Sequence, residues 1–379
     1  MTMSKNIFGE LQEKEVFVSA EQINLKESRP IFGIYYKETA IFNVFPEGKK
    51  GNKLGKFVLD EKDLDAKLQL CGVLNDTGVT FYSYGKKINY QTYNLYQNIF
   101  SRNSGILETN VMNDKRVVIL GCGSVGSLVA LELARAGVGN FFLVDADIVE
   151  YHNLCRHQCG IEDVGNLKVL AVKKRILNIN PKANVQVFDG IVQNVPEKML
   201  SDFCVEKETI FVGCADNRSA DVYANRIASY FKASFLSIGF WERAFAGEIF
   251  YHIPGKNMPC YHCALGDGGD LSGRVEANHH VYSMEENIEQ LKFEPGISVD
   301  INFITTIGIK LIIDILNYHE PGFTPRLLNN LTQYTLVCNT SNPAIGGEMV
   351  EIFSYPLQVT TSLKVGFGKK CVGKCRNEY

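Results

Sequence analysis

The chain has 379 residues, which at about 150 residues per domain corresponds to two or three domains and excludes a single small module. Hydrophobic residues make up 45% and charged residues 21%, as in soluble globular proteins, so a disordered, collagenous or coiled-coil chain is excluded. The 39 basic and 42 acidic residues give a net charge of −3, so no overall positive charge attracts nucleic acid or anionic lipid.

The sequence also indicates a cytoplasmic protein that does not enter the membrane. Residues 1–17 carry charges throughout and contain no apolar run, so we expect no secretion signal. The 11 cysteines are an odd number and lie mostly in apolar segments, which favours a reducing compartment. The longest apolar stretch, 301–318, is interrupted by Asn302, Lys310 and Asp314, which predicts an amphipathic helix.

The first 89 residues differ in pattern from the rest, and we predict that they form a small α+β domain for substrate recognition. Residues 30–45 contain two short β-rich runs, and a basic, glycine-punctuated turn follows them. Apolar residues between Asp60 and Leu74 have helical spacing, so we expect a helix there. Residues 90–112 would then form an arm or linker.

From residue 113 to the end we predict one α/β domain. Its pattern alternates strands, expected at 116–120, 141–144, 209–212 and 235–239, with helices, expected at 125–136, 168–177 and 218–231. This alternation predicts a Rossmann-like, open and mostly parallel sheet with helices on both faces.

The segment GCGSVG follows the first of these strands and opens a helix. In this context Gly121, Gly123 and Gly126 permit a tight turn and a close backbone approach, and the helix N-terminus favours a phosphate. Asp145 ends the next strand, where an acid commonly accepts the ribose hydroxyls. A loop that only packs strand on helix, and a capping carboxylate, are the structural alternatives. Up to this point an NAD enzyme and an ATP enzyme fit equally well.

The residues that follow favour the ATP enzyme. Asn153, Arg156 and Lys168 come after the strand that carries the acid. Two cations suit nucleotidyl transfer, in which charge accumulates on the α-phosphate and the departing pyrophosphate, whereas hydride transfer does not need them. A solvated helix face is the alternative for both cations. Asp216, followed by Asn217, ends another strand, where a carboxylate can hold Mg²⁺ or cap the next helix.

Two cysteine pairs predict a structural zinc site. Cys260 and Cys263 have two residues between them, and Cys371 and Cys375 have three. Four thiolates in two close pairs suit a closed tetrahedral Zn²⁺ site. A redox pair and free core cysteines are the alternatives.

Together these segments resemble the ThiF/MoeB adenylyltransferases, relatives of the catalytic domain of ubiquitin-activating enzymes. The matching pieces, within residues 115–375, are GCGSVGS, LVDADIVEYHNLCRH, EDVGNLKVLAVKKRILNINP, GCADNRSADVYANR and PGKNMPCYHC. The resemblance implies catalytic roles for Arg156, Lys168 and Asp216, with Asp216 as the magnesium ligand. The implied nucleotide-binding set is Gly121, Gly123, Gly126, Asp145 (ribose), Asp147, Asn153, Arg156, Lys168, Asp216 and Asn217.

The implied reaction is attack by a C-terminal carboxylate on the α-phosphate of ATP, which gives an acyl adenylate and pyrophosphate. The implied substrate is a small ubiquitin-like or sulfur-carrier protein or a ribosomal peptide. The layout of the N-terminal domain resembles the MccB-type, microcin-maturing members, whose extra domain clamps a peptide. The family also implies a homodimer, in which an arginine of the arm reaches the ATP of the partner subunit. Arg102 of this arm is displaced from the family's position; it would act on the partner's ATP, and a plain surface arginine is the alternative.

Other parts of the sequence also depart from the patterns of the family and its thioester-forming relatives. His157 stands where the family usually has Gln, and we assign it no role. The crossover segment, about 264–300, contains no cysteine between Ala264 and Asp300. We therefore expect no thioester on this segment. Two other classes remain open from sequence: an NAD-dependent oxidoreductase and a catalytically silent scaffold.

Overall fold

The computed structural model describes residues 13–46, 51–215, 217–265, 295–361, 363–368, 371 and 375. The chain divides into two compact units, Met1–Arg102 and Asn103–Tyr379. Among the described residues no helix is both long enough and apolar enough to cross a membrane.

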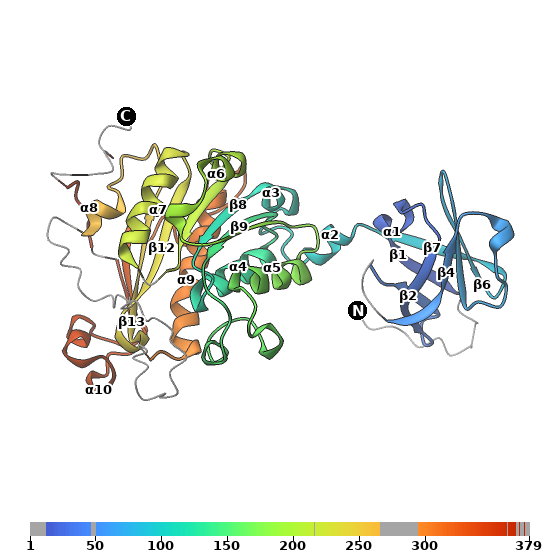
Figure 1. Cartoon of the computed structure of the whole chain (residues 1–379), viewed down its shortest axis with the longest axis horizontal. Helices are drawn as coiled ribbons and strands as arrows, with labels where there is room; N and C mark the ends of the chain where they lie inside the picture. Colours follow the sequence, from blue (N-terminus) through green and yellow to red (C-terminus); the bar gives the residue numbers. More distant parts are fainter. Residues whose placement is uncertain are drawn as a thin grey trace. The chain divides into compact units, whose positions relative to one another are not determined.

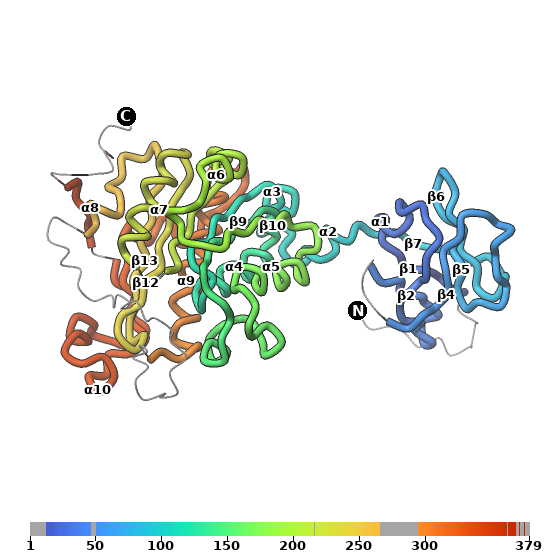
Figure 2. The backbone as a smooth tube through the Cα atoms, viewed as in Figure 1, coloured from blue at the N-terminus to red at the C-terminus, as the bar shows by residue number. Residues whose placement is uncertain are grey.

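The N-terminal unit is a closed barrel with strand order β1-β3-β2-β4-β5-β6-β7, whose backbone is drawn in blue in Figure 2. Strand β1 pairs with both β3 and β7, which closes the barrel. Alternate residues of β6 are buried, as expected for a strand with one face toward the interior. The strands are β1 (Glu15–Ser19), β2 (Arg29–Tyr36), β3 (Ile41–Val44), β4 (Asn52–Val58), β5 (Leu70–Asn75), β6 (Gly78–Ser83) and β7 (Lys86–Tyr93), and the short helices are α1 (Ala20–Asn24), η1 (Glu61–Asp63) and α2 (Leu95–Ile99).

The two β-rich runs predicted at 30–45 are confirmed as β2 and β3. The helix predicted from Asp60 to Leu74 is wrong, because only a single turn, η1, forms before strand β5. Nearly all of β5 is buried, so its apolar run is continuous, and such a run fits helical spacing as well as strand spacing. Strand β7 includes residues 90–93, which the sequence pattern assigned to the arm.

The C-terminal unit contains an eight-stranded sheet with the order β10-β9-β8-β11-β12-β13-β14-β15 (Figure 1). The five strands from β10 to β12 are parallel, and the pairs from β12 to β15 are antiparallel. The predicted mostly parallel α/β architecture is therefore confirmed. The strands are β8 (Arg116–Leu120), β9 (Asn140–Asp145), β10 (Asn184–Asp189), β11 (Thr209–Gly213), β12 (Ser234–Phe240), β13 (Ala246–His252), β14 (Tyr334–Cys338) and β15 (Val359–Thr360).

Helices cover both faces of this sheet. Along β8, Val117 and Ile119 join the core formed with α4, α5 and α9, whereas Val118 and Leu120 join the core formed with α6 and α7. The carboxyl ends of the parallel strands therefore lie together at one edge of the sheet, between the two layers of helices. The helices are α3 (Thr109–Asp114), α4 (Ser124–Ala136), η2 (Tyr151–Asn153), η3 (Ile161–Asp163), α5 (Lys168–Ile179), η4 (Val192–Asn194), α6 (Glu197–Phe203), α7 (Arg218–Tyr230), η5 (Glu242–Ala244), α8 (Tyr261–Leu265), α9 (Ser298–Asn317), α10 (Pro343–Gly346) and η7 (Gly347–Ile352).

Candidate active site

The segment Gly121–Gly126, called the glycine loop below, runs from the end of β8 into the first turn of α4. Gly121 has a φ of 94°, a left-handed conformation that favours glycine. A Cβ at Gly126 would lie 1.8 Å from the carbonyl oxygen of Gly121, so glycine is required where α4 crosses the loop. A Cβ at Gly123, the N-cap of α4, would meet no atom within 4 Å. The space beside this residue is therefore open, as phosphate binding at this helix N-terminus requires.

Asp145, at the end of β9, lies against the glycine loop. Its carboxylate accepts a hydrogen bond from the backbone N–H of Cys122 at 2.6 Å and one from Asp147 at 2.8 Å. Burial raises the pKa of Asp145, and the nearby Lys168 ammonium and the two backbone N–H groups oppose this shift. The structure thus brings the predicted ribose-binding acid into contact with the predicted phosphate loop.

Lys168, the first residue of α5, lies in the same group of charges. Its Nζ forms an ion pair with the Asp147 carboxylate at 2.7 Å, and its backbone N–H donates to the carbonyl of Asp147. The lysine side chain is 10% exposed, while the Asp147 side chain is 51% exposed. A largely buried ammonium is therefore held beside the glycine loop by a carboxylate that solvent reaches.

Asn153 and Arg156 lie in the segment between β9 and α5. The Asn153 side-chain oxygen accepts the N–H of Glu150 at 3.0 Å, and its carbonyl accepts the N–H of Arg156 at 3.0 Å. These bonds fold the chain into a turn on which Arg156 is half-buried. A side chain added at Gly296 would come within 3.9 Å of Nη1 of Arg156, so the guanidinium lies beside the segment that leads into α9.

A buried ion pair fixes the rest of this segment. The Asp163 carboxylate accepts hydrogen bonds from Nε and Nη2 of Arg175 at 3.1 and 2.7 Å, from Lys174 at 3.2 Å and from the N–H of Gly160 at 3.1 Å. Burial acts to raise the pKa of Asp163, but these hydrogen bonds outweigh it and lower the pKa to about 2. Since the acid stays charged and α5 donates two of its cations, the segment that carries Arg156 is anchored to that helix.

The strand β11 leads to the remaining predicted site residues. Asp216 lies outside the described residues, so its role as a magnesium ligand stays a prediction. Asn217 is the N-cap of α7, and its side chain accepts the N–H groups of Ser219 and Ala220 at 2.8 and 3.2 Å. Helix capping thus falls to Asn217, which keeps the start of α7 at the carboxyl edge of the sheet.

The four cysteines predicted to bind zinc come together from distant parts of the chain. The Sγ atom of Cys260 lies 3.7 Å from that of Cys263 and 3.4 Å from that of Cys371, and the Sγ atom of Cys375 lies 3.6 Å from that of Cys263 and 3.3 Å from that of Cys371. A tetrahedral site with Zn–S bonds of about 2.3 Å places its sulfurs about 3.8 Å apart, so this cluster fits the ion. Burial raises the pKa of the Cys260 thiol and raises that of Cys375 to about 12, whereas for Cys371 hydrogen bonds with the neighbouring cysteines outweigh burial and lower the pKa to about 7. A bound cation would favour the thiolate form of all four.

The ThiF family model matches residues 96–343. The chain belongs to the ThiF family. Among curated ThiF relatives, it is 29% identical over 182 residues to ubiquitin-like modifier-activating enzyme 5 of Caenorhabditis elegans, covering 44% of this chain and 42% of that protein. It is 32% identical over 160 residues to the sulfur carrier protein ThiS adenylyltransferase of Bacillus subtilis, covering 41% and 45%. The chain thus spans less than half the length of these two relatives.

The structure of this ThiF-family chain also resembles E. coli MccB, solved with ATP. The match has 19% sequence identity and a TM-score of 0.48, and it covers 70% of this chain and 68% of MccB.

Sequence reasoning assigned no role to one residue that contacts the glycine loop. His157 is buried behind the glycine loop, with Nε2 2.7 Å from the carbonyl oxygen of Cys122. Its Nδ1 accepts the N–H of Cys159 at 3.0 Å, so Nε2 carries the proton and donates it to Cys122. Burial lowers the pKa of His157, which favours this neutral form. Histidine is not the residue that the family usually has at position 157. Only the fold shows that the His157 ring contacts the glycine loop.

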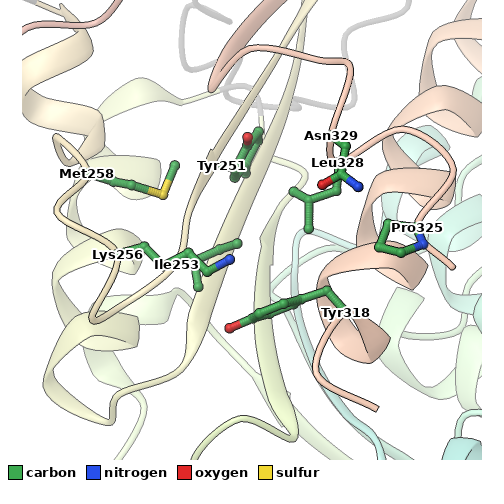
Figure 3. A pocket seen from close by; sticks show the side chains of 8 residues that line it. All are labelled: Tyr251, Ile253, Lys256, Met258, Tyr318, Pro325, Leu328 and Asn329. Atoms are coloured by element: carbon green, nitrogen blue, oxygen red, sulfur yellow. The ribbon is translucent and has the colours of Figure 1, made fainter. Parts of the chain in front are cut away.

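A pocket of about 340 Å³, whose lining side chains are drawn in Figure 3, contains none of these residues. It opens beyond the end of β13, where His252 pairs with Phe235 at the start of β12. That is the sheet edge opposite to the glycine loop, and none of the predicted site residues lines the pocket. Its lining consists of Tyr251, Ile253, Lys256, Met258, Tyr318, Pro325, Leu328 and Asn329.

Proposed function

We propose that this chain activates the C-terminal carboxylate of a small ubiquitin-like or sulfur-carrier protein, or of a ribosomal peptide, by ATP-dependent adenylation. The observation that carries the proposal is the meeting of the glycine loop, Asp145 and Lys168 at the carboxyl edge of the parallel sheet. The names of the curated relatives, which activate ubiquitin-like modifiers or adenylate the sulfur carrier ThiS, support the same substrate class.

In this mechanism the substrate carboxylate is itself the nucleophile. One of its oxygens forms a bond to the α-phosphorus of ATP, the bond from that phosphorus to the bridging oxygen breaks, and pyrophosphate leaves with the electron pair. A carboxylate is already ionised at neutral pH, so no general base is needed. The protein contributes position and positive charge.

The residues of the site divide this work. The N–H groups of the glycine loop and the start of α4 would hold phosphate oxygens, and Asp145 would accept the ribose hydroxyls. Lys168 and Arg156 would neutralise charge on the α-phosphate and on pyrophosphate, and Asn153 would hold the turn that carries the arginine. Asp147 keeps the lysine beside the loop through the 2.7 Å ion pair.

Two metal ions belong to the proposal. Magnesium, with Asp216 as its ligand, would neutralise phosphate charge when bound. Zinc, held by the four cysteines, would have a structural role, because it joins the segment near residue 371 to α8.

We further propose a homodimer in a reducing, cytoplasmic compartment. Arg102 is exposed, and in this proposal it acts on the ATP of the partner subunit. Light scattering at micromolar concentration tests the dimer, and a fully active monomer would refute it.

The decisive experiment measures pyrophosphate release from ATP and Mg²⁺ in the presence of a sulfur-carrier protein that ends in a Gly-Gly carboxylate. The same carrier with an amidated C-terminus is the control, and a peptide with a free C-terminal asparagine tests the peptide substrate. We expect pyrophosphate release only with substrates whose C-terminal carboxylate is free. An NAD-dependent change in nicotinamide absorbance would favour an oxidoreductase, and absence of nucleotide binding would favour a scaffold.

A further inference from the structure

A buried carboxylate, Glu248, lies in β13, apart from the nucleotide-binding residues. Its side chain is 2% exposed. Its Oε2 accepts hydrogen bonds from the Tyr334 hydroxyl at 2.6 Å and from Nε1 of Trp241 at 3.2 Å, and lies 3.4 Å from Nη2 of Arg218. The Tyr261 hydroxyl lies 3.5 Å from Oε1. These four partners belong to β14, the N-cap of η5, α7 and α8.

A carboxylate is costly to bury unless it is paired and hydrogen-bonded. The chain places Glu248 among apolar side chains such as Phe250 and Phe245, in the core beneath α7. A plain apolar residue would fill this position without needing four donors. The acid therefore holds the groups around it in place. Two of these groups connect Glu248 to the start of α7 and to the cysteine cluster.

The first group is the start of α7. Arg218 is the first residue of this helix and directly follows Asn217 and Asp216. Its side chain is 10% exposed, and its Nε has no hydrogen-bond partner in the part of the chain that the structure describes. Among the described residues, the ion pair with Glu248 is thus what holds this guanidinium in place. Removing the carboxylate would leave a buried, unpaired cation on a residue two positions after the predicted magnesium ligand in sequence.

The second group is the cysteine cluster. Tyr261 lies between Cys260 and Cys263 and is fully buried. Its hydroxyl contacts Glu248, and its backbone N–H donates to the side-chain oxygen of Asn225 on α7 at 2.8 Å. The same helix that begins at the candidate active site is therefore fastened to the cysteine cluster.

We propose that Glu248 is a positioning residue for adenylation, which fixes the start of α7 through Arg218 and connects it through Tyr261 to the cysteine cluster. This inference rests on the proposed function. Glu248 does not touch the nucleotide in this proposal, and it acts through the position of Asn217 and Arg218 at the start of α7. Displacements of about 1 Å in a site can cost about 100-fold in rate.

The fluorescence of one tryptophan can be used to follow the contacts of Glu248. Trp241 is its single tryptophan, is buried, and donates its indole N–H to Glu248. The emission of a buried indole depends on that hydrogen bond and on the charge of its acceptor. Binding of ATP and Mg²⁺ at the start of α7 should therefore change Trp241 fluorescence through Arg218 and Glu248.

The test compares Glu248→Gln, the double variant Glu248→Gln with Arg218→Met, and Tyr334→Phe as control. The double variant removes both charges and so avoids an unpaired buried cation if the single variant folds poorly. Tyr334→Phe removes a hydrogen bond to Glu248 and leaves the contact with α7. We measure zinc content, ATP binding by calorimetry, Trp241 emission upon adding ATP and Mg²⁺, and pyrophosphate release with the Gly-Gly carrier protein.

We expect both Glu248 variants to keep one zinc per chain, to lose the ATP-dependent emission change, and to release pyrophosphate about 100-fold more slowly. Tyr334→Phe should keep the emission change and stay within a few-fold of the wild-type rate. Wild-type emission changes and rates in folded Glu248 variants would overturn the positioning role. A wild-type protein that binds ATP but releases no pyrophosphate with any carrier or peptide would overturn the proposed function instead, and the emission change would still decide the role of Glu248.

Discussion

Alanine at two neighbouring glycines should separate the folding role of the glycine loop from its binding role. At Gly126 a Cβ would lie 1.8 Å from the Gly121 carbonyl oxygen and 3.2 Å from Ile119 Cγ2. Side-chain carbons essentially never approach closer than 3.0 Å, so α4 and the loop would have to separate by about 1.2 Å in a close-packed interior. Because the clashing oxygen belongs to the backbone, no side chain can turn away. We expect Gly126→Ala to destabilise the protein by about 3 kcal/mol, near the upper end for overpacking.

Gly123→Ala is the matched control, because its Cβ meets nothing within 4 Å and the φ of −73° suits alanine. The added methyl would nevertheless stand where the phosphates approach the N-terminus of α4. Thermal unfolding and calorimetric ATP binding distinguish the two effects. Gly126→Ala should unfold about 6 to 12 °C lower, and Gly123→Ala should unfold like wild type while ATP affinity falls at least about tenfold. Wild-type ATP affinity in Gly123→Ala would refute phosphate binding at this loop, and an unchanged midpoint in Gly126→Ala would refute the packing argument.

Two further predictions concern charge and metal. Arg156→Ala and Asp216→Ala should each lower substrate-dependent pyrophosphate exchange about 100-fold or more while leaving the unfolding midpoint nearly unchanged, since both are proposed to stabilise charge; near wild-type exchange in either variant would defeat its assignment. Metal analysis should find one zinc per chain, and Cys371→Ser or a chelator should remove it and lower thermal stability, because each of the four sulfurs lies 3.3 to 3.7 Å from two others of the cluster. Full zinc and stability in Cys371→Ser would reject the site.

The parallel sheet and the glycine loop could be predicted because their signals are local. The strand at 116–120 and the helix that follows agree with β8 and α4 to within a residue. These signals are the spacing of the glycines, an acid at the end of a strand and cysteines in pairs. Each reflects a backbone conformation or a ligand that only a few neighbouring residues determine. The meeting of Asp145 with the loop follows from the parallel pairing of β8 and β9, which the alternation of strands and helices already implies.

Features that depend on distant contacts could not be predicted. Strand β5 resembled a helix, because both of its faces are buried against other residues of the N-terminal unit. The support that His157 gives to Cys122 spans 35 residues. Glu248 sits in an apolar strand among partners from four elements, and no spacing rule connects it with Arg218, 30 residues away. Such contacts are set by tertiary packing, which a single sequence does not display.

The last prediction is that the adenylate is the end point of this chain's own chemistry, or is passed to another nucleophile, without a thioester on the crossover segment. The stretch from Ala264 to Asp300 contains no cysteine, and the four clustered cysteines would be occupied by zinc. Of the two cysteines beside Arg156, Cys159 is buried and burial raises its pKa to about 11, so little thiolate exists at neutral pH. Cys155 is exposed and is the stronger exception. Incubation with ATP and a carrier protein, followed by a non-reducing gel, should show no band sensitive to dithiothreitol. A band that disappears in Cys155→Ala but persists in Cys159→Ala would show instead that the activated carboxylate is transferred to Cys155, whose exposed thiol lies next to the arginine proposed to bind the phosphates.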